Sequence, residues 1–265
     1  MVKILHKKYL FWYNFRYIGD EMKNINYEAL KGDEHVCKSW SLMPLKIDDN
    51  YEYISKNIIF NFVSTIILIP IAIILYFFNK IFLGFEIEGK ENKIKNSGFV
   101  SVSNHIHYLD CTFIGLINFP NKIYYPTIQE NFKIPFVRHL IKLLCAIPIP
   151  KERKHKDKFY KQINEALEKN SILHMYPEGS LWPYYENIRD FKYGAFKIAV
   201  EANKPIEPIR FVFVNPDGIQ KLYKRKKCVH AIILPAIYPD VSLEYKERIE
   251  DLRNKAYEAI CKGGN

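Results

Sequence analysis

The sequence predicts an α/β domain with a mixed sheet flanked by helices, preceded by an N-terminal membrane-associated helical segment. Two observations lead to this fold class: residues 58–78 carry no charge, and after Lys80 short β-rich runs alternate with stretches of helical periodicity. Such alternation is typical of a domain whose sheet is largely buried by helices. We therefore expect an N-terminal extension over residues 1–56, a membrane-embedded helix over 57–80 and a globular domain over 81–265.

The uncharged stretch lies between Lys56 and Lys80. A bilayer core about 30 Å thick is crossed by roughly 20 apolar helical residues. Length and composition therefore favour membrane association over a buried core helix or a segment that lies in the interface. Because basic residues stand on both flanks, the positive-inside rule gives no clean orientation, and spanning and half-inserted helices both stay open.

The extension before this stretch is rich in aromatic residues that follow no clear period. Aromatic rings at this density suit a membrane interface, where an apolar body and a polar tip both find partners. A small extension packed on the main domain would explain them equally well. The residues concerned are Tyr9, Phe11, Trp12, Tyr13, Phe15, Tyr17, Trp40, Tyr51 and Tyr53.

Beyond Lys80 the elements follow from periodicity. Helices are expected where apolar residues recur every three or four positions, as at Phe159, Ile163 and Leu167. Strands are expected at short runs of β-branched and aromatic residues. The predicted strands cover residues 99–103, 123–127, 171–176, 206–214 and 229–234, and the predicted helices cover 156–170, 191–202 and 241–261.

The composition narrows the possible partners. The 265 residues carry a formal net charge of +10, and 48% of them are hydrophobic, which rules out wholesale disorder. A basic chain suits nucleic acid, an anionic membrane surface or phosphate-bearing substrates. No recognised nucleic-acid motif accompanies the charge, so we expect no nucleic-acid partner. The five cysteines form no CxxC pair, which argues against a disulfide framework or a zinc site.

The first candidate site covers residues 103–110, which follow a predicted strand and should open a helix. Asp110 comes five residues after His105, so its carboxylate can reach one imidazole nitrogen, fix the tautomer and stabilise the imidazolium. This is the base half of a hydrolase triad without the serine. It suffices when the nucleophile is a hydroxyl of the substrate and the acyl donor is an activated thioester.

Three other interpretations attach to this segment. His105, His107 and Asp110 could bind a metal, although the remaining histidines are isolated and none stands in HExxH spacing. Cys111 could be a nucleophile, but a lone cysteine beside an apolar run is more often a buried small hydrophobe. His105 could also be purely structural.

The second candidate site covers residues 175–180, again at a strand end. Gly179 would let backbone N–H groups approach a phosphate or an oxyanion, and Glu178 could accept a hydrogen bond from a substrate hydroxyl. Taken alone, Pro177-Glu178-Gly179 is also a common turn.

Together these segments resemble the 1-acyl-glycerol-3-phosphate acyltransferase family of the glycerolipid acyltransferase superfamily. The resemblance runs from about Phe82 to Phe213 and rests on four motifs in order, and the apolar N-terminal segment also fits bacterial members. The motifs are Asn104-His105 with Asp110, the block from Ile134-Pro135-Phe136 to Pro150-Lys151, Pro177-Glu178-Gly179-Ser180 followed by Phe191–Ala195, and the segment Lys204-Pro205-Ile206-Glu207-Pro208-Ile209.

The resemblance implies a role for each matching residue. His105 would be the general base for the acceptor hydroxyl, and Asp110 would orient and charge-stabilise it. Glu178 and Gly179 would position the glycerol backbone. The other predicted substrate-binding residues are Asn104, Ser180 and the basic residues Lys151, Arg153, Arg189 and Lys192, which would hold the phosphate.

Two departures from the family pattern concern the acceptor. Pro150-Lys151 stands where the family usually has Asp-Arg, with Arg153 close by, and Leu181 replaces the basic residue of the usual EGTR. Arg189 or Lys192 could supply that charge, although lysine lacks the guanidinium fork that binds two phosphate oxygens. Lysophosphatidic acid is the default acceptor, and another lysophospholipid is an open alternative.

The expected function is therefore direct acyl transfer to a lysophospholipid in phospholipid biosynthesis, without metal or bound cofactor. The co-substrate would be a thioester of coenzyme A or acyl carrier protein, and the chain would work at the cell membrane with its active site on the cytoplasmic face. A metal-dependent hydrolase and a non-catalytic lipid-binding protein are the alternatives. The basic runs at residues 151–158 and 224–227 are solvated turns or contacts with anionic lipid headgroups.

Overall fold

The computed structural model of the chain describes Tyr27, Leu30 and residues 45–133 and 137–263. The chain divides into two compact units, residues 1–34 and 35–265, and every strand named below belongs to the second. Tyr9 to Tyr17, Trp40 and Ile134-Pro135-Phe136 lie outside the described residues.

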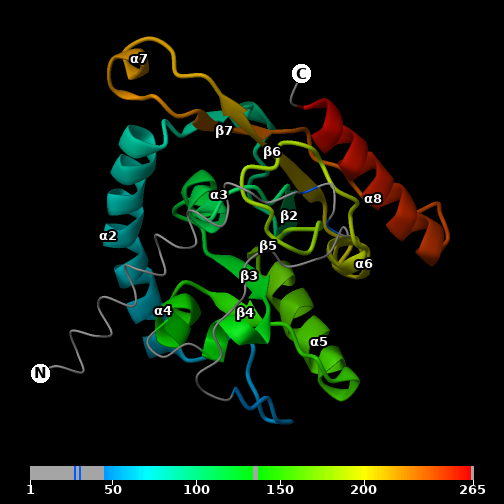
Figure 1. The fold of residues 1–265 in the computed structure, drawn as a ribbon. Coiled ribbons are helices and arrows are strands. Elements are labelled where there is room, and N and C mark those ends of the chain that lie inside the picture. Colours follow the sequence, from blue (N-terminus) through cyan, green and yellow to red (C-terminus); the bar gives the residue numbers. More distant parts are fainter. Residues whose placement is uncertain (1–26, 28–29, 31–44, 134–136, 264–265) are drawn as a thin grey trace, which may run out of the picture. The chain divides into compact units, whose positions relative to one another are not determined.

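The second unit is built on a seven-stranded mixed sheet (Figure 1). Strands β6 and β7 pair antiparallel, and all other neighbours pair parallel. The predicted mixed α/β fold is therefore confirmed. The order is β1 (Glu86–Glu88), β7 (Cys228–Ile233), β6 (Ile206–Val214), β2 (Phe99–Ser103), β5 (Ile172–Met175), β3 (Ile123–Thr127) and β4 (Ala146–Pro148).

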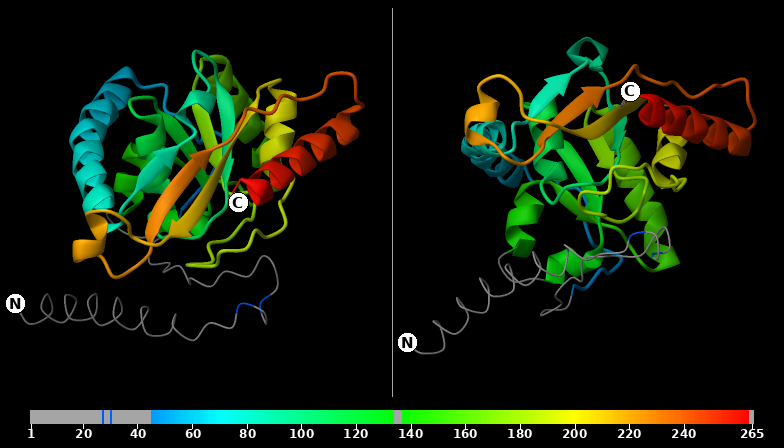
Figure 2. Two further views of the ribbon diagram at one scale, coloured as in Figure 1. Left: turned by 90° about the horizontal axis from the view of Figure 1, so that it is seen from above. Right: turned by 45° about the horizontal axis from the view of Figure 1, so that its top comes forward.

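Helices cover both faces of this sheet (Figures 1 and 2). One core joins the sheet to α5 (Lys156–Glu168), α6 (Gly194–Glu201) and α8 (Tyr245–Lys262), and the other joins it to α3 (Asp110–Asn118). Alternate side chains of β2 enter the two cores, Phe99 on the α3 side and Val100 on the other. The remaining helical segments are α2 (Ile58–Phe82), α4 (Val137–Leu143), α7 (Gln220–Tyr223) and the 3-10 turns η3 (Lys90–Asn92), η4 (Gln129–Lys133) and η5 (Arg153–His155).

The predicted elements agree with this structure where the pattern is long. Strands β2, β3 and β6 have the predicted bounds, whereas α6 begins three residues later than expected, at Gly194. Phe191 suggested the earlier start because it is apolar and in phase with the helix. It is indeed buried in the core, but it precedes the helix. The three-residue strands β1 and β4 were not predicted, because so short a run shows no period.

Helix α2 contains the uncharged stretch and packs along the domain by a narrow polar stripe. Ser64 Oγ donates to the Leu143 carbonyl at 2.6 Å, and Asn79 Nδ2 donates to Thr112 Oγ1 of α3 at 3.1 Å. Both side chains are completely buried. Most apolar side chains of α2 are exposed instead, including Ile58, Phe62, Ile66, Ile69, Ile73, Ile74, Phe77, Ile81 and Phe82.

Part of the predicted extension packs on the domain. Tyr53 is buried, its ring contacts Phe159 of α5 edge-on, and the backbone amides of Tyr53 and Ile54 donate to Gln162 Oε1. Of the two interpretations of the aromatic extension, packing on the main domain therefore applies to Tyr53.

Candidate active site

The two predicted motifs meet because β2 and β5 are parallel neighbours. Val102 is in register with Met175, so the loops that follow these strands leave the same edge of the sheet side by side. Ligands of open α/β sheets bind at such carboxyl ends of strands. Asn104, the first residue after β2, is fully buried and exchanges two hydrogen bonds of 2.9 and 2.8 Å with the backbone of Phe211 in β6.

His105 and Asp110 form the predicted dyad. His105 Nδ1 lies 2.8 Å from Asp110 Oδ2, and the same oxygen accepts from the backbone amides of Ile106 and His107 at 2.8 and 3.0 Å. Asp110 is the first residue of α3, where the helix dipole favours a carboxylate. Because an ionised carboxylate only accepts, Nδ1 carries the hydrogen and Nε2 is left as the basic nitrogen. The His105 side chain is 22% exposed, whereas Asp110 is fully buried.

An aromatic stack fixes the plane of the imidazole. The ring of Tyr176 lies parallel to that of His105, with centroids 3.8 Å apart and an angle of 10°. The ring of His174 packs edge-on against the ring of Tyr176, with centroids 4.6 Å apart. The Tyr176 hydroxyl is buried and has no hydrogen-bond partner among the described residues, and burial raises its pKa well above the usual value of 10.

A buried ion pair between Glu178 and Arg189 holds the main chain of His105. Glu178 Oε2 accepts from the His105 amide at 3.1 Å and from the Arg189 guanidinium at 2.7 Å, and Oε1 accepts from the Arg189 amide at 3.1 Å. Arg189 also donates to Ser180 Oγ at 2.8 Å and to the Ser180 carbonyl, and it stacks over Trp182. Burial raises the pKa of the Glu178 carboxyl, and the adjacent guanidinium opposes this effect.

Several predicted substrate-binding residues contact the protein itself. The polar side chains of Asn104, Glu178, Ser180 and Arg189 are buried and hydrogen-bonded to protein groups, and their roles toward a substrate stay predictions. The guanidinium of Arg189 lies beside the Glu178 carboxylate. Buried cations persist when they are paired in this way.

Gly179 and Lys192 lie together at the surface of the second loop. Gly179 has a φ of +85°, and a Cβ at this position would lie 2.8 Å from Lys192 Nζ. The Gly179 amide donates to the Tyr176 carbonyl at 3.0 Å, which closes the turn. The prediction that backbone N–H groups near Gly179 bind an oxyanion stays a prediction. Lys192 is exposed and places an ammonium group against the turn.

Lys151 and Arg153 lie farther along the same sheet edge. Both follow β4, and β5 and β3 lie between β4 and β2, so at about 4.8 Å per strand the two strands are roughly 14 Å apart. Lys151 pairs with Glu130, and Arg153 is exposed on η5. The structure brings Lys192 to the dyad's side of the site but not these two residues.

His107 lies beside the dyad without taking part in it. It is buried, its Nδ1 accepts from the Leu109 amide at 3.1 Å, and burial lowers its pKa below the usual 6.5 despite the opposing effect of Asp110. Among the described residues, no group of three or more His, Cys, Asp or Glu side chains could hold a metal ion. The expectation of a metal-free site stays a prediction.

Tyr176, Trp182 and His174 have no role that was predicted from the sequence. An aromatic residue directly before the Pro177 turn was the available signal for Tyr176. Nothing in the sequence pointed to the contacts of Trp182, whose amide donates to the His105 carbonyl at 3.2 Å.

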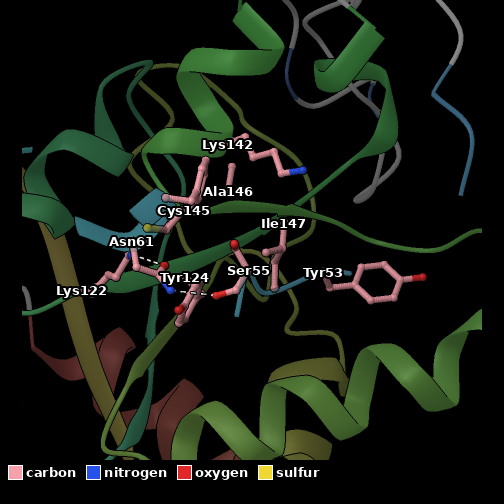
Figure 3. A pocket seen from close by; sticks show the side chains of 10 residues that line it. Tyr53, Ser55, Asn61, Lys122, Tyr124, Lys142, Cys145, Ala146 and Ile147 are labelled. Carbon is pink, nitrogen blue, oxygen red and sulfur yellow. Dashed lines mark hydrogen bonds between the residues drawn. The ribbon is translucent and has the colours of Figure 1, made fainter. Parts of the chain in front are cut away.

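A small cavity lies elsewhere, between the start of α2 and strands β3 and β4 (Figure 3). Its volume is about 20 Å³, and its walls include Asn61, Lys122 and Cys145. A space of this size holds about one water molecule. None of its lining residues belongs to the dyad or its loops.

Comparisons with known proteins agree with the motifs and the fold. An acyltransferase family model matches residues 84–212. The 1-acyl-sn-glycerol-3-phosphate acyltransferase of Bacillus subtilis (strain 168) is 26% identical over 167 residues, which are 63% of this chain and 81% of the relative. The crystal structure of the 1-acyl-sn-glycerophosphate (LPA) acyltransferase PlsC from Thermotoga maritima has a TM-score of 0.52 at 22% identity, covering 74% of this chain and 80% of that one, and supports the fold. Residues 84–212 therefore match the acyltransferase family, and the chain is a distant homologue of 1-acyl-sn-glycerol-3-phosphate acyltransferase.

Proposed function

We propose that the protein transfers a fatty acyl group from a coenzyme A or acyl carrier protein thioester to the free hydroxyl of 1-acyl-glycerol-3-phosphate, giving phosphatidic acid for phospholipid synthesis. The observation that carries this proposal is the His105–Asp110 dyad, with 2.8 Å between Nδ1 and Oδ2 at the carboxyl ends of the strands. The family supplies the reaction class, and the similarity to a lysophosphatidic acid acyltransferase supports the acceptor.

The chemistry follows from the dyad. The acceptor hydroxyl gives its proton to His105 Nε2 as its oxygen attacks the thioester carbonyl, and Asp110 stabilises the imidazolium that forms. The tetrahedral intermediate then expels the thiolate, which takes the proton from the imidazolium. An ester bond forms as the thioester bond breaks, so no covalent enzyme intermediate is needed.

Lys192 is the proposed phosphate ligand. Its ammonium lies against the Gly179 turn, beside the loop that holds the dyad, and Leu181 leaves position 181 without a charge. A lysine contributes a point charge rather than a two-pronged hydrogen-bond donor, so it discriminates less sharply between phosphate-bearing headgroups. Glu178 and Arg189 act indirectly, by holding the His105 main chain.

Helix α2 is the proposed membrane anchor. It is a described helix long and apolar enough to cross a bilayer. Its buried contacts at Ser64 and Asn79 are 15 residues apart, or about 22 Å along the axis, and both bind it to the domain. A helix held along a globular domain over that length has no lipid on its bound side. We therefore propose that α2 lies in one leaflet with its exposed apolar face in the acyl chains, on the cytoplasmic side.

The test is an assay of thiol release from a long-chain acyl thioester by the detergent-purified chain. Wild type and His105→Ala are compared with and without lysophosphatidic acid, and a parallel sample contains a chelator. Acceptor-dependent release that is lost in His105→Ala and insensitive to the chelator is expected. Release that persists in His105→Ala would exclude the proposed base, and chelator-sensitive release without acceptor would favour a metal-dependent hydrolase.

The headgroup is tested with a panel of lysophospholipids and Lys192→Met. Loss of the ammonium should raise the KM for lysophosphatidic acid while leaving the KM for the thioester unchanged. Lys197→Met, which changes a partly exposed lysine of α6 that pairs with Glu201, is the matched control. If another lysolipid is acylated faster than lysophosphatidic acid, the proposed acceptor is wrong and the reaction class stands.

A further inference from the structure

The loop between β6 and β7 carries exposed apolar side chains that no packing explains. This α7 loop covers residues 215–227 and contains the four-residue helix α7. Ile219 is 74% exposed and Leu222 84% exposed, and Tyr223 beside them is also exposed. Adjacent apolar side chains so fully exposed on one tip indicate a surface that contacts another apolar phase.

The same loop is strongly basic. Only Asp217 opposes its five positive charges. Lys224 and Lys227 make contacts within the protein, to the Phe82 carbonyl and to Glu186, whereas Lys221, Arg225 and Lys226 are exposed around the apolar tip. An apolar tip surrounded by cations matches the boundary between lipid acyl chains and anionic headgroups.

The α7 loop is continuous with the apolar face of α2. Lys224 Nζ donates to the carbonyl of Phe82, the last residue of α2, at 2.6 Å, and the Val229 amide donates to the Leu83 carbonyl at 3.1 Å. Cys228 Sγ lies 2.8 Å from Gln220 Oε1, both buried, which ties α7 to β7. Figures 1 and 2 show α7 beside the C-terminal end of α2 in every view.

We propose that the α7 loop is a second lipid contact, which binds an anionic bilayer surface through its basic residues and inserts Ile219 and Leu222 among the acyl chains. A lipid contact beside the C-terminal end of α2 would restrict rotation about the helix axis, which α2 alone would leave open. The inference rests on the proposed attachment of α2 to one leaflet and is independent of the acyl-transfer reaction. An acidic protein would match the charge but would leave the continuity with the apolar face of α2 unexplained.

The experiment measures contact between the loop and lipid acyl chains by tryptophan quenching. The full-length chain with Leu222→Trp is reconstituted into vesicles of phosphatidylcholine, alone or mixed with phosphatidylglycerol, in which the acyl chains are brominated and quench tryptophan on contact. Wild type gives the background of the three native tryptophans. Val241→Trp is the matched control. Val241 is 68% exposed and precedes α8, and α8 lies on the side of the domain opposite α2 in Figure 1.

Quenching is expected at position 222 and not at position 241, and it should be stronger in the anionic vesicles. Arg225→Glu with Lys226→Glu should lower the loop's lipid contact by at least about five-fold for each charge. The control pair Lys161→Glu and Lys246→Glu changes the net charge equally on α5 and α8 and should have no such effect.

Several results would overturn the proposal. Equal and weak quenching at both positions would mean that the tip does not reach lipid. Equal quenching in both vesicle types, unaffected by the charge reversals, would remove the anionic surface as partner. The emission of Leu222→Trp is also measured after acyl carrier protein is added without vesicles. If it changes as much as it does with anionic vesicles, the loop is a protein-docking site and the proposal is wrong. Leu222→Trp is also measured together with His105→Ala, which removes the proposed base. Quenching that persists in this double variant shows that lipid contact does not depend on the acyl-transfer reaction.

Discussion

Arg189 and Glu178 form a buried ion pair in which the guanidinium lies 2.7 Å from Oε2, and that same oxygen accepts the backbone amide of His105. The pair therefore connects the second loop to the main chain of the proposed base. Its two charges are shielded from water and depend on each other.

Removing one partner should destabilise the fold more than it alters substrate binding. Arg189→Met leaves the Glu178 carboxylate buried beside no cation, and the expected loss is about 3–5 kcal/mol of unfolding free energy. Denaturant unfolding in detergent measures it. Arg225→Met, an exposed arginine, should stay within about 0.5 kcal/mol of wild type. Adding Glu178→Gln should recover part of the loss, and an Arg189→Met variant as stable as wild type would show that the pair contributes little.

Asp110→Asn should reduce turnover while leaving the fold intact. Because Oδ2 alone accepts from His105 Nδ1 and from the Ile106 and His107 amides, the Asn oxygen can take its place and keep all three contacts. The variant loses the negative charge that stabilises the imidazolium, a hydrogen bond to a charged group worth about 1.5–3 kcal/mol, so kcat should fall by roughly one to two orders of magnitude with little change in KM. Steady-state thiol release measures this, with circular dichroism as the control for folding. An unchanged kcat would mean that the charge of Asp110 does not stabilise the imidazolium.

The Tyr176 stack is tested by separating its ring from its hydroxyl. Tyr176→Leu removes a ring contact worth about 0.5–1.5 kcal/mol, so kcat should fall by roughly two- to ten-fold. Tyr176→Phe keeps the ring and removes a buried hydroxyl without a partner among the described residues, so the protein should become about 1 kcal/mol more stable at unchanged kcat. Rates and unfolding curves are measured for both. A large loss of kcat in Tyr176→Phe would show instead that the hydroxyl binds substrate.

His174 should make the fold sensitive to acid. Burial lowers its pKa well below 6.5, so below that pH the unfolded chain binds a proton that the folded chain does not. Stability is therefore lost as the pH falls from about 6.5 towards the folded-state pKa, by up to about 1.4 kcal/mol per pH unit. His107 adds a contribution of the same sign.

The contribution of His174 is isolated with His174→Gln, whose amide can still pair with Ser101 Oγ, the partner of His174 Nδ1 at 3.1 Å. As the pH is lowered from 7 to 5, the free energy of unfolding should fall less steeply in this variant than in wild type. Parallel curves for the two proteins would mean that His174 titrates alike in both states.

The sequence by itself determined the features that depend on local spacing. Strands β2, β3 and β6 follow from the apolar pattern, and the dyad follows because His105 and Asp110 are separated by less than two helical turns across one strand-to-helix junction. The length of the uncharged stretch likewise indicated a long apolar helix, which α2 is.

Only the tertiary structure decided which side chains the dyad meets. Glu178 and Arg189 were predicted as substrate-binding residues, but no pattern in the sequence indicated that they contact each other. The parallel pairing of β2 with β5 brings them beneath His105 and places Tyr176 against its ring. Likewise the contacts of Ser64 and Asn79 fix α2 along the domain. Such contacts join distant parts of the chain through space, and periodicity along the sequence contains no record of them.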